Sequence, residues 1–441
     1  MANSRDFSLA FMAFCLLTAV MILRPGEMLA GLEGVPIYEG LIFTTLALSA
    51  RRVMQFFTPN ALCSQPITLC LVGVFVAIPL SHLTHSYFGG MLESTIEFTK
   101  AALFYALLVA TVDTWERFEK LCVVIAVCAT TTVALCVIDF VGLVDFEFIK
   151  HINDSHGVTE TGETAHVLRM NGTGIFSDPN DISLLIVATG VLCVSFLWDR
   201  ERSQSRLLWL GPLAVLVTGL FCTKSRGGLL ALGAACGVMI MFRYGKQVAI
   251  AIGLLGAVAV PLLAGRQAEI DISDGTGHDR ILLWRDGLAA VMSSDIVFGT
   301  GHRTYHDIAG LVAHNSFVHA FVELGLFGGT FFFGLFFFSA LGLFRLNEPQ
   351  WRIQHPRQAR FLPFMAAIGA GWTIGLFSLS RCYTVSTLLI LGLGTAYLNL
   401  ANWNIQPRRL VLQWDRTHRR QLVLASAALF VGLNLFVRVV G

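Results

Sequence analysis

Thirteen apolar runs with few charged residues follow one another along the chain, separated by polar stretches. A helix that crosses a bilayer needs about 20 apolar residues, with about 17 to 25 the usual range. The runs lie near residues 7–23, 36–50, 66–83, 98–112, 119–144, 181–197, 207–222, 227–242, 247–264, 316–344, 361–380, 385–402 and 421–438. The pattern predicts an all-α integral membrane protein with about 12–13 transmembrane helices, in which residues 1–441 form a single polytopic membrane domain. Whether the run 421–438 spans the membrane stays open.

Two long polar loops, residues 145–180 and 265–315, interrupt this pattern. Lys and Arg bias loops toward the cytoplasm, so the basic residues orient the chain. With the N-terminus inside, 19 of the 31 Lys and Arg residues fall on the inner side, and six of the other 12 lie in the two long loops. The charge pattern therefore places both long loops on the outer face, where ten of the 12 histidines also fall.

The composition indicates a lipid environment, because 55% of the residues are hydrophobic and 14% are charged. An ordinary soluble domain carries about 25% charged residues. The net charge of +2 implies no nucleic-acid partner. The ten cysteines lie in or beside apolar runs without metal-ligand spacing, and we interpret them as small buried residues. Nothing in the sequence indicates a cofactor.

The segment T-K-S-R-G-G at 223–228 predicts a very short outer turn between two spans. Arg226 stands where the next helix is expected to begin, and two glycines follow it. A helix N-terminus offers unpaired N–H groups and partial positive charge to a phosphate, and a guanidinium matches phosphate oxygens. The alternative is a basic side chain that extends to the membrane surface. Because an arginine is unfavourable at the positive end of a helix, we favour anion binding.

In the loop 265–315, the segment G-H-D-R-I-L-L-W-R-D-G-L-A-A-V-M predicts an amphipathic helix with Asp279 as its N-cap. Arg280 and Trp284 are four residues apart and share one face of this helix. Leu288 and Val291 extend the same stripe. Such a helix lies along the membrane surface with Trp284 as an anchor. Arg280 then needs an anionic partner, either a lipid diphosphate or a carboxylate of the loop.

Two neighbouring segments bring histidines to the outer end of a span: G-T-G-H-R-T-Y at 299–305 and A-H-N-S-F-V-H-A-F-V-E-L-G-L-F-G-G at 313–329. Histidine is suited to accept a proton from a sugar hydroxyl near neutral pH, and we interpret His314, beside Asn315, as functional. Glu323 lies deeper and shares a helix face with His319. An intramembrane carboxylate indicates a function, whereas His319 alone fits an interfacial hydrogen-bonding residue.

The segment R-M-N-G-T-G-I-F-S-D-P-N-D at 169–181 ends where a span begins. Asp178, with the proline and asparagine that follow it, predicts a turn and a helix cap, and capping alone explains these residues. Arg169 is the neighbour of most interest. Arg381, in a later outer turn, is a weaker candidate for an anion site.

Metal binding has limited support in the sequence. His302 and His306 have i,i+4 spacing, but no H-E-x-x-H arrangement or dense carboxylate cluster accompanies them. The outer arginines already supply the positive charge that a metal ion would contribute at a diphosphate. The sequence therefore predicts no metal site.

In order and spacing, these motifs resemble the O-antigen ligase/polymerase superfamily of bacterial membrane glycosyltransferases. The resemblance is carried by F-S-D-P-N at 176–180, S-R-G-G at 225–228, Arg280 with Trp284, G-T-G at 299–301, H-N at 314–315 and E-L-G-L-F-G at 323–328. It covers most of residues 170–330. The family usually has about twelve spans, so one of the thirteen runs is extra or does not span.

The resemblance implies a glycan donor on undecaprenyl diphosphate and an inverting, metal-independent transfer at the periplasmic face of the inner membrane. Carried over to this chain, it makes His314 the base that activates the acceptor hydroxyl. Arg226 and Arg280 would bind the diphosphate, and Arg303 joins them by its place in the loop. The supporting residues would be Asn315, Glu323, Trp284 and Asp178.

The predicted function is an O-antigen ligase-like glycosyltransferase surrounded by membrane lipid, with a lipid A core favoured over another glycan as the acceptor. Polymerisation of repeat units and transfer to a protein use the same donor chemistry, and both stay open. The alternative from another class is a transporter or flippase of lipid-linked sugars. Many transporters show two related halves with a site near the bilayer midplane. Here no duplication is visible and the charged candidates gather at one face.

Overall fold

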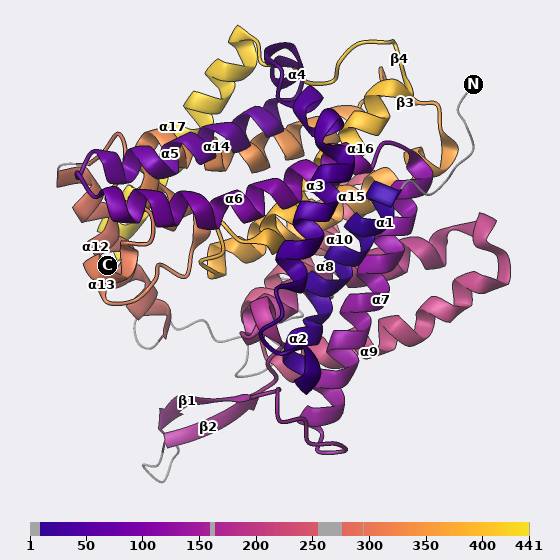
Figure 1. The fold of residues 1–441 in the computed structure, drawn as a ribbon, viewed down its shortest axis with the longest axis horizontal. Coiled ribbons are helices and arrows are strands. Elements are labelled where there is room, and N and C mark those ends of the chain that lie inside the picture. The colour runs from indigo at the N-terminus through magenta and orange to yellow at the C-terminus, as the bar shows by residue number, and fades with distance from the viewer. Residues whose placement is uncertain (1–8, 159–163, 255–275, 294, 441) are drawn as a thin grey trace. The chain divides into compact units, whose positions relative to one another are not determined.

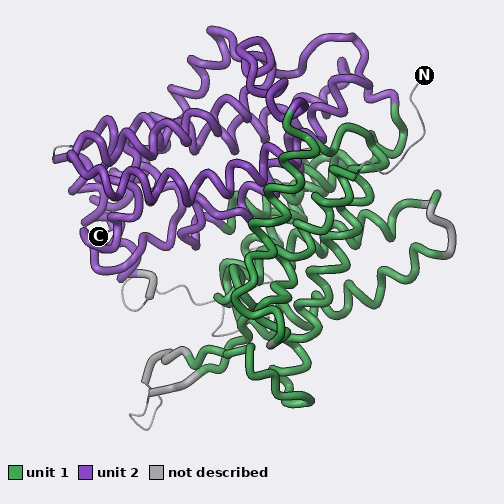
Figure 2. The backbone as a smooth tube through the Cα atoms, in the orientation of Figure 1, with its two compact units in different colours: residues 1–50, 111–267, 355–375 green, residues 51–110, 268–354, 376–441 purple. Residues whose placement is uncertain are grey.

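The computed structural model describes residues 9–158, 164–254, 276–293 and 295–440, which fold mainly into helices (Figure 1). The chain divides into two compact units (Figure 2): unit 1 comprises residues 1–50, 111–267 and 355–375, and unit 2 comprises residues 51–110, 268–354 and 376–441. Among the described residues, nine helices are long and apolar enough to cross a membrane. The predicted all-α membrane class is confirmed. The predicted span 247–264 beyond residue 254, and residues 265–275 of the second long loop, lie outside the described residues.

Unit 1 consists of helices and one β-hairpin. Its elements are α1 (Leu9–Leu23), α2 (Pro25–Met28), η1 (Ala30–Leu32), α3 (Ile37–Phe56, whose end belongs to unit 2), α7 (Trp115–Phe140), β1 (Ile152–Val158), β2 (Thr164–Arg169), η2 (Gly174–Phe176), α8 (Pro179–Trp198), η3 (Arg200–Trp209), α9 (Leu210–Thr223), α10 (Arg226–Tyr244) and α15 (Pro356–Gly375).

Helix α8 is the centre of unit 1, because it contacts α7, α9, α10 and α15. Small residues let these helices approach closely. A Cβ added at Gly375 on α15 would overlap Leu184 on α8, and one added at Gly371 would lie 3.0 Å from the carbonyl oxygen of Ala231 on α10. Membrane helices pack through such small residues, so these glycines determine how closely α8, α10 and α15 pack.

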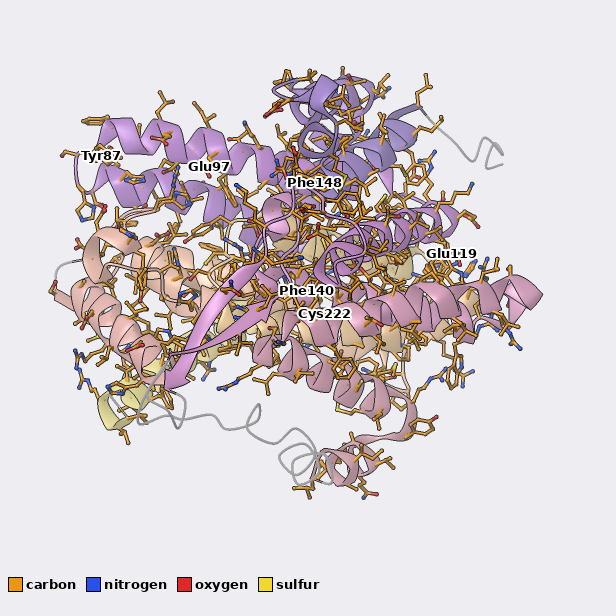
Figure 3. All side chains as sticks on the ribbon, turned by 90° about the horizontal axis from the view of Figure 1, so that it is seen from below. Tyr87, Glu97, Glu119, Phe140, Phe148 and Cys222 are labelled. Atoms are coloured by element: carbon orange, nitrogen blue, oxygen red, sulfur yellow. The ribbon has the colours of Figure 1, made fainter. Side chains whose placement is uncertain are left out.

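The first long loop contains an element that the sequence did not predict, the antiparallel hairpin of β1 and β2. The hairpin is held at its base, near the labelled Phe140 and Cys222 (Figure 3). The ring of His151 packs against Phe140 at 5.1 Å between centroids, and the N–H of Met170 donates to the carbonyl of Cys222 at 3.0 Å. An isolated two-stranded hairpin is marginal in water. Contacts outside the strands therefore decide its formation, and local sequence does not reveal them.

Unit 2 consists of helices and one short strand pair. Its elements are α4 (Pro59–Ser64), α5 (Pro66–Leu83), α6 (Phe88–Thr111), α12 (Thr276–Ser293), α13 (Tyr305–Ala309), α14 (Ser316–Leu346), β3 (Arg352–Ile353), η5 (Leu376–Ser378), α16 (Val385–Trp403), β4 (Ile405–Gln406) and α17 (Arg416–Val440).

Helix α14 is the centre of unit 2 and contacts α5, α12, α16 and α17. The sequence predicts one continuous span here, but α14 is broken at Gly325, where φ is 63° and ψ is −167°. The N–H groups of Leu326 and Phe327 donate instead to the carbonyls of residues 296–297, at 2.8 and 2.9 Å. Backbone groups inside a membrane need such partners. The segment after α12 therefore pairs with the broken helix through its backbone, although the side chains of Ile296 and Val297 are exposed.

Candidate functional site

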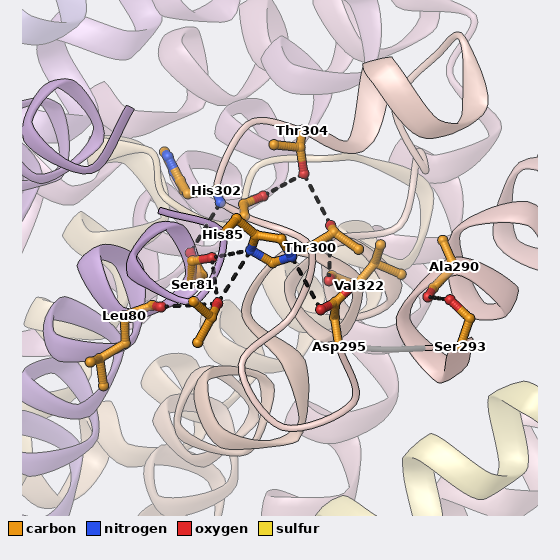
Figure 4. A network of polar contacts seen from close by, with 12 residues as sticks. Leu80, Ser81, His85, Ala290, Ser293, Asp295, Thr300, His302, Thr304 and Val322 are labelled. Atoms are coloured by element: carbon orange, nitrogen blue, oxygen red, sulfur yellow. Dashed lines mark hydrogen bonds and ion pairs between the residues drawn. The ribbon is translucent and has the colours of Figure 1, made fainter. Parts of the chain in front are cut away.

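Residues 295–305 form a loop that lies against the break in α14, and Figure 4 shows part of its polar contacts. The N–H of Gly301 donates to the carbonyl of Glu323 at 3.1 Å. Gly299 has a φ of 80°, and a Cβ added there would overlap the same carbonyl. The G-T-G motif thus has a physical cause, because only glycine allows the loop backbone to touch the backbone of α14 in this conformation.

Glu323 is the polar centre of this junction and is completely buried. Its Oε1 lies 2.9 Å from Nε2 of His319 and accepts a hydrogen bond from the N–H of Tyr305 at 3.3 Å. The rings of His319 and Tyr305 stack with centroids 5.0 Å apart. The predicted placement of His319 and Glu323 on one helix face is confirmed. A buried carboxylate needs such partners, and through them Glu323 ties α14 to the start of α13.

His302 is a second buried titratable residue in this junction, with 4% of its surface exposed. Its backbone N–H donates to the hydroxyl of Ser81 at 3.2 Å (Figure 4), and its imidazole ring centroid lies 4.5 Å from the ring centroid of Tyr383. Among the described residues, neither ring nitrogen has a hydrogen-bond partner. Burial lowers the pKa of His302 from 6.5 to about 4, although the charge of Glu323 acts in the opposite direction.

We expect the buried His302 to make the protein sensitive to acid. The unfolded chain binds a proton at this histidine below about pH 6.5, whereas the folded protein does so only near pH 4. Stability is therefore lost as the pH falls between these values, by up to about 3 kcal/mol. Thermal unfolding in detergent at pH 7 and pH 4.5 should show a smaller acid loss for His302→Gln than for the wild type. An equal loss of thermal stability at pH 4.5 in both proteins would show that His302 is not the source of the acid sensitivity. His306→Gln, at an exposed position, is the control.

His314 precedes the N-cap residue of α14 and has a left-handed backbone, with φ 48°, and its side chain is half-buried. Asn315 is completely buried and caps α14, because its Oδ1 accepts two N–H groups of the first turn at 3.0 and 3.2 Å. The hydroxyl of Ser316 donates to the carbonyl of Leu379 at 2.6 Å. A non-glycine residue in this conformation costs about 1–3 kcal/mol and persists only where its surroundings hold it. The residues that follow His314 supply that constraint.

Helix α12 is the predicted amphipathic helix. Leu288 and Val291 are buried, and the helix packs against α14 and α17. It begins at Thr276, so Asp279 lies in its first turn. The interpretation of Asp279 as the N-cap is therefore wrong, although a carboxylate in the first turn still favours the positive end of the helix.

Trp284 links α12 to the segment that carries His314. Its indole Nε1 donates to the carbonyl of Ala313 at 2.6 Å, and its ring centroid lies 6.2 Å from that of Phe436. Arg280 is half-buried and precedes Trp284 on the same helix. The indole hydrogen bond therefore brings the helix that carries Arg280 to the residue before His314, an arrangement that the sequence did not predict.

Arg303 also has a left-handed backbone, with φ 66°, but its side chain is 56% exposed. Its Nη1 lies 2.7 Å from Glu97 and 3.2 Å from Glu93, both on α6. The sequence did not predict these partners. Exposed ion pairs contribute only about 0–1 kcal/mol, so an anionic ligand would compete with weakly bound carboxylates for this guanidinium.

In unit 1, Arg226 is the first residue of α10, as predicted, and its side chain is exposed. Ser225 caps the helix, because its hydroxyl oxygen accepts the N–H of Gly228 at 3.0 Å. Lys224 completes the turn in the left-handed conformation, with φ 49°. The segment thus presents Arg226 at the positive end of a helix, where negative charge is stabilised.

Asp178 caps α8, and its Oδ1 accepts two N–H groups of the first turn at 2.8 and 3.4 Å. The capping prediction is confirmed. Asn180 has a further contact, because its Oδ1 accepts a hydrogen bond from the hydroxyl of Ser225 at 2.7 Å. The motifs at 176–180 and 225–228, which are far apart in the sequence, therefore lie side by side in unit 1.

Comparison with known proteins agrees with these motifs. Residues 211–333 match a family model described as O-Antigen ligase. The resemblance to the O-antigen ligase/polymerase superfamily is confirmed. No curated protein matches the chain. The O-antigen ligase match runs from α9 into α14 and supports an enzyme of the ligase/polymerase type in a multi-pass membrane protein.

The predicted site residues fall in both units. Unit 2 carries Arg280, Trp284, Arg303, His314, Asn315 and Glu323, and unit 1 carries Asp178 and Arg226. The contacts of Ser81 and Tyr383 with His302 were missed, because residues so distant in sequence leave no local signal. In the described part of the chain, no group of three or more His, Cys, Asp or Glu side chains is arranged to hold a metal ion.

Proposed function

We propose that this protein is a ligase-like membrane glycosyltransferase. It transfers a glycan from undecaprenyl diphosphate to an acceptor hydroxyl, with a lipid A core as the favoured acceptor, at the periplasmic face of the bacterial inner membrane. The transfer inverts the anomeric carbon and requires no metal ion. The observation that carries this proposal is His314, a conformationally strained residue at the start of α14 within the O-antigen ligase stretch 211–333.

The proposed step begins when His314 accepts the proton of the acceptor hydroxyl as that oxygen attacks the anomeric carbon. The bond between the anomeric carbon and the diphosphate oxygen breaks, and undecaprenyl diphosphate leaves with the bonding electron pair. Arg226 and Arg280 balance the negative charge that grows on the leaving group. Such groups stabilise a transition state most when they are fixed before the charge develops. Arg303 joins them by releasing its carboxylate partners on α6.

A reconstituted reaction tests this proposal. Purified protein is incubated in EDTA with a lipid-diphosphate glycan and a lipid A–core acceptor, and glycan on lipid A is the expected product. Lengthened lipid-linked glycan without modified lipid A would replace the ligase with a polymerase. A product found only on an added acceptor protein would replace it with a protein O-oligosaccharyltransferase. No transfer at all, together with movement of labelled lipid-linked glycan across proteoliposome membranes, would replace the enzyme with a flippase.

Arg280→Gln should weaken the binding of undecaprenyl diphosphate about 10- to 100-fold, the effect of losing hydrogen bonds to a charged group. Arg285→Gln is a matched control, because Arg285 is an exposed arginine on the same helix and its partner is the neighbouring Asp286. A fluorescent undecaprenyl diphosphate analogue, titrated in detergent, provides the measurement. Equal affinities of the two variants for the analogue would remove Arg280 from the diphosphate site.

A further inference from the structure

We propose that Arg169 is a positioning residue that fixes the turn presenting Arg226 to the diphosphate. This inference rests on the proposed role of Arg226 in donor binding. Arg169 ends strand β2 and is half-buried, while Arg226 begins α10 and is exposed. The two residues are far apart in the sequence, and the hydrogen bonds of unit 1 connect them through the turn between α9 and α10.

The guanidinium of Arg169 joins two separate helix ends. Its Nε donates to the carbonyl of Thr223, the last residue of α9, at 3.1 Å. Its Nη2 donates to Oδ1 of Asn180, in the first turn of α8, also at 3.1 Å. The planar guanidinium presents its donors in a fixed geometry, which the point charge of a lysine does not reproduce. Arg169 therefore fixes the end of α9 relative to the start of α8.

The connection continues from Asn180 to the start of α10. The same Oδ1 that accepts from Arg169 also accepts from the hydroxyl of Ser225 at 2.7 Å. Ser225 is 2% exposed and caps α10 through the N–H of Gly228. One carbonyl oxygen thus joins Arg169 to the N-cap residue that immediately precedes Arg226. The whole connection lies within unit 1.

The turn itself needs this support. It contains Lys224 in the left-handed conformation, which costs free energy unless neighbouring contacts maintain it. Arg169 binds the residue before Lys224, and Asn180 binds the residue after it. The hydroxyl of Ser183 also donates to that of Ser225 at 3.2 Å, but only Arg169 among these side chains holds the end of α9. Without Arg169, the turn loses this anchor and Arg226 moves.

The test compares Arg169→Gln, Arg169→Lys, Asn180→Ala and the double variant Arg169→Gln/Asn180→Ala in the transfer assay. Arg169→Gln should raise the KM for the lipid-diphosphate donor about tenfold, with kcat changed less. Arg169→Lys should remain impaired, because a restored charge does not restore the planar fork. Asn180→Ala should give a similar defect. In the double variant, the KM for the donor should rise much less than the about 100-fold expected from two independent effects, because both side chains act through one connection.

Arg243→Gln is the matched control. Arg243 lies near the other end of α10, where its guanidinium stands over the ring of Trp198 at 4.1 Å. Its loss should lower the thermal stability without changing the KM for the donor. Should Arg169→Gln yield no folded protein by gel filtration, Asn180→Ala carries the same test.

Three results would overturn the inference: an unchanged donor KM in both single variants, full recovery with Arg169→Lys, or additive effects in the double variant. Binding of undecaprenyl diphosphate separates this inference from the proposed function. A wild type that binds the lipid but transfers no glycan would refute the proposed function alone. In that case Arg169→Gln should still weaken the binding as much as Arg226→Gln does. Retained affinity in Arg169→Gln would refute the positioning role alone.

Discussion

His314→Ala should lower the rate of glycan transfer about 10²- to 10⁴-fold, the usual contribution of a positioned general base. Binding of the lipid-diphosphate donor should change little, because the role proposed for the histidine is at the acceptor. His314→Asn is the sharper variant, because asparagine tolerates the left-handed backbone that this position requires. It retains the conformation and removes the basic nitrogen, so its rate should fall as far as that of the alanine variant.

The measurement is single-turnover transfer with saturating donor, followed over a range of acceptor concentrations. His306→Ala is the control, because that residue is an exposed histidine on the neighbouring helix α13. Added imidazole should restore part of the transfer rate of His314→Ala, because it can replace the missing base. It should not restore a rate that was lost because the backbone had shifted. Wild-type turnover in His314→Asn would exclude His314 as the base and leave its strained backbone without a functional explanation.

Features set by local chemistry could be predicted from the sequence. Nine of the thirteen apolar runs correspond to described helices that are long and apolar enough to cross a membrane, because a span is recognised by length and composition alone. Asp178 was predicted as a cap since capping involves only the next few residues. The pairing of His319 with Glu323 followed from their i,i+4 spacing in a helix. Each of these inferences needs no knowledge of the rest of the chain.

Features set by distant partners could not be predicted. The sequence drew attention to Arg303, but its carboxylate partners are more than 200 residues away, on α6. His302 was noticed for its spacing to His306, whereas the structure buries one and exposes the other. The break in α14 at Gly325 lies within an apolar run that predicted one continuous helix. The sequence thus identified several residues that matter in the structure, but not what holds them.

The candidate site residues show the same contrast between features with local causes and features with distant ones. Local motifs pointed to Arg226 and His314 as separate candidates, at a helix start and at a span entrance. The structure adds what holds each of them, a hydrogen-bonded turn for Arg226 and the capped start of α14 for His314. The sequence had drawn attention to Arg169 and Asn315, but it did not show that Arg169 binds the turn before Arg226 or that Asn315 caps α14. The contacts of a positioning residue are therefore harder to predict than its identity.

Gly299→Ala should nearly abolish activity and lower the free energy of unfolding by about 2–6 kcal/mol, the sum of backbone strain and overpacking. The residue has a φ of 80°, and the added Cβ would meet the carbonyl carbon and oxygen of Glu323 and the N–H nitrogen of Gly325. All of these are backbone atoms, so no side-chain rotation relieves the overlap. The loop must instead move away from α14, which breaks the contacts of Gly301 and Tyr305 with Glu323.

Gly310→Ala separates the steric effect from the conformational one. Gly310 ends α13 with a φ of 77°, but a Cβ there would have no neighbour within 4 Å. Its substitution should cost only about 1–2 kcal/mol, the penalty of the left-handed backbone. Thermal unfolding and transfer rate, measured for both variants in the same detergent, provide the comparison. Equal losses would mean that strain alone explains Gly299. A much larger loss for Gly299→Ala would show that contact between the G-T-G loop and the broken helix maintains this part of the site.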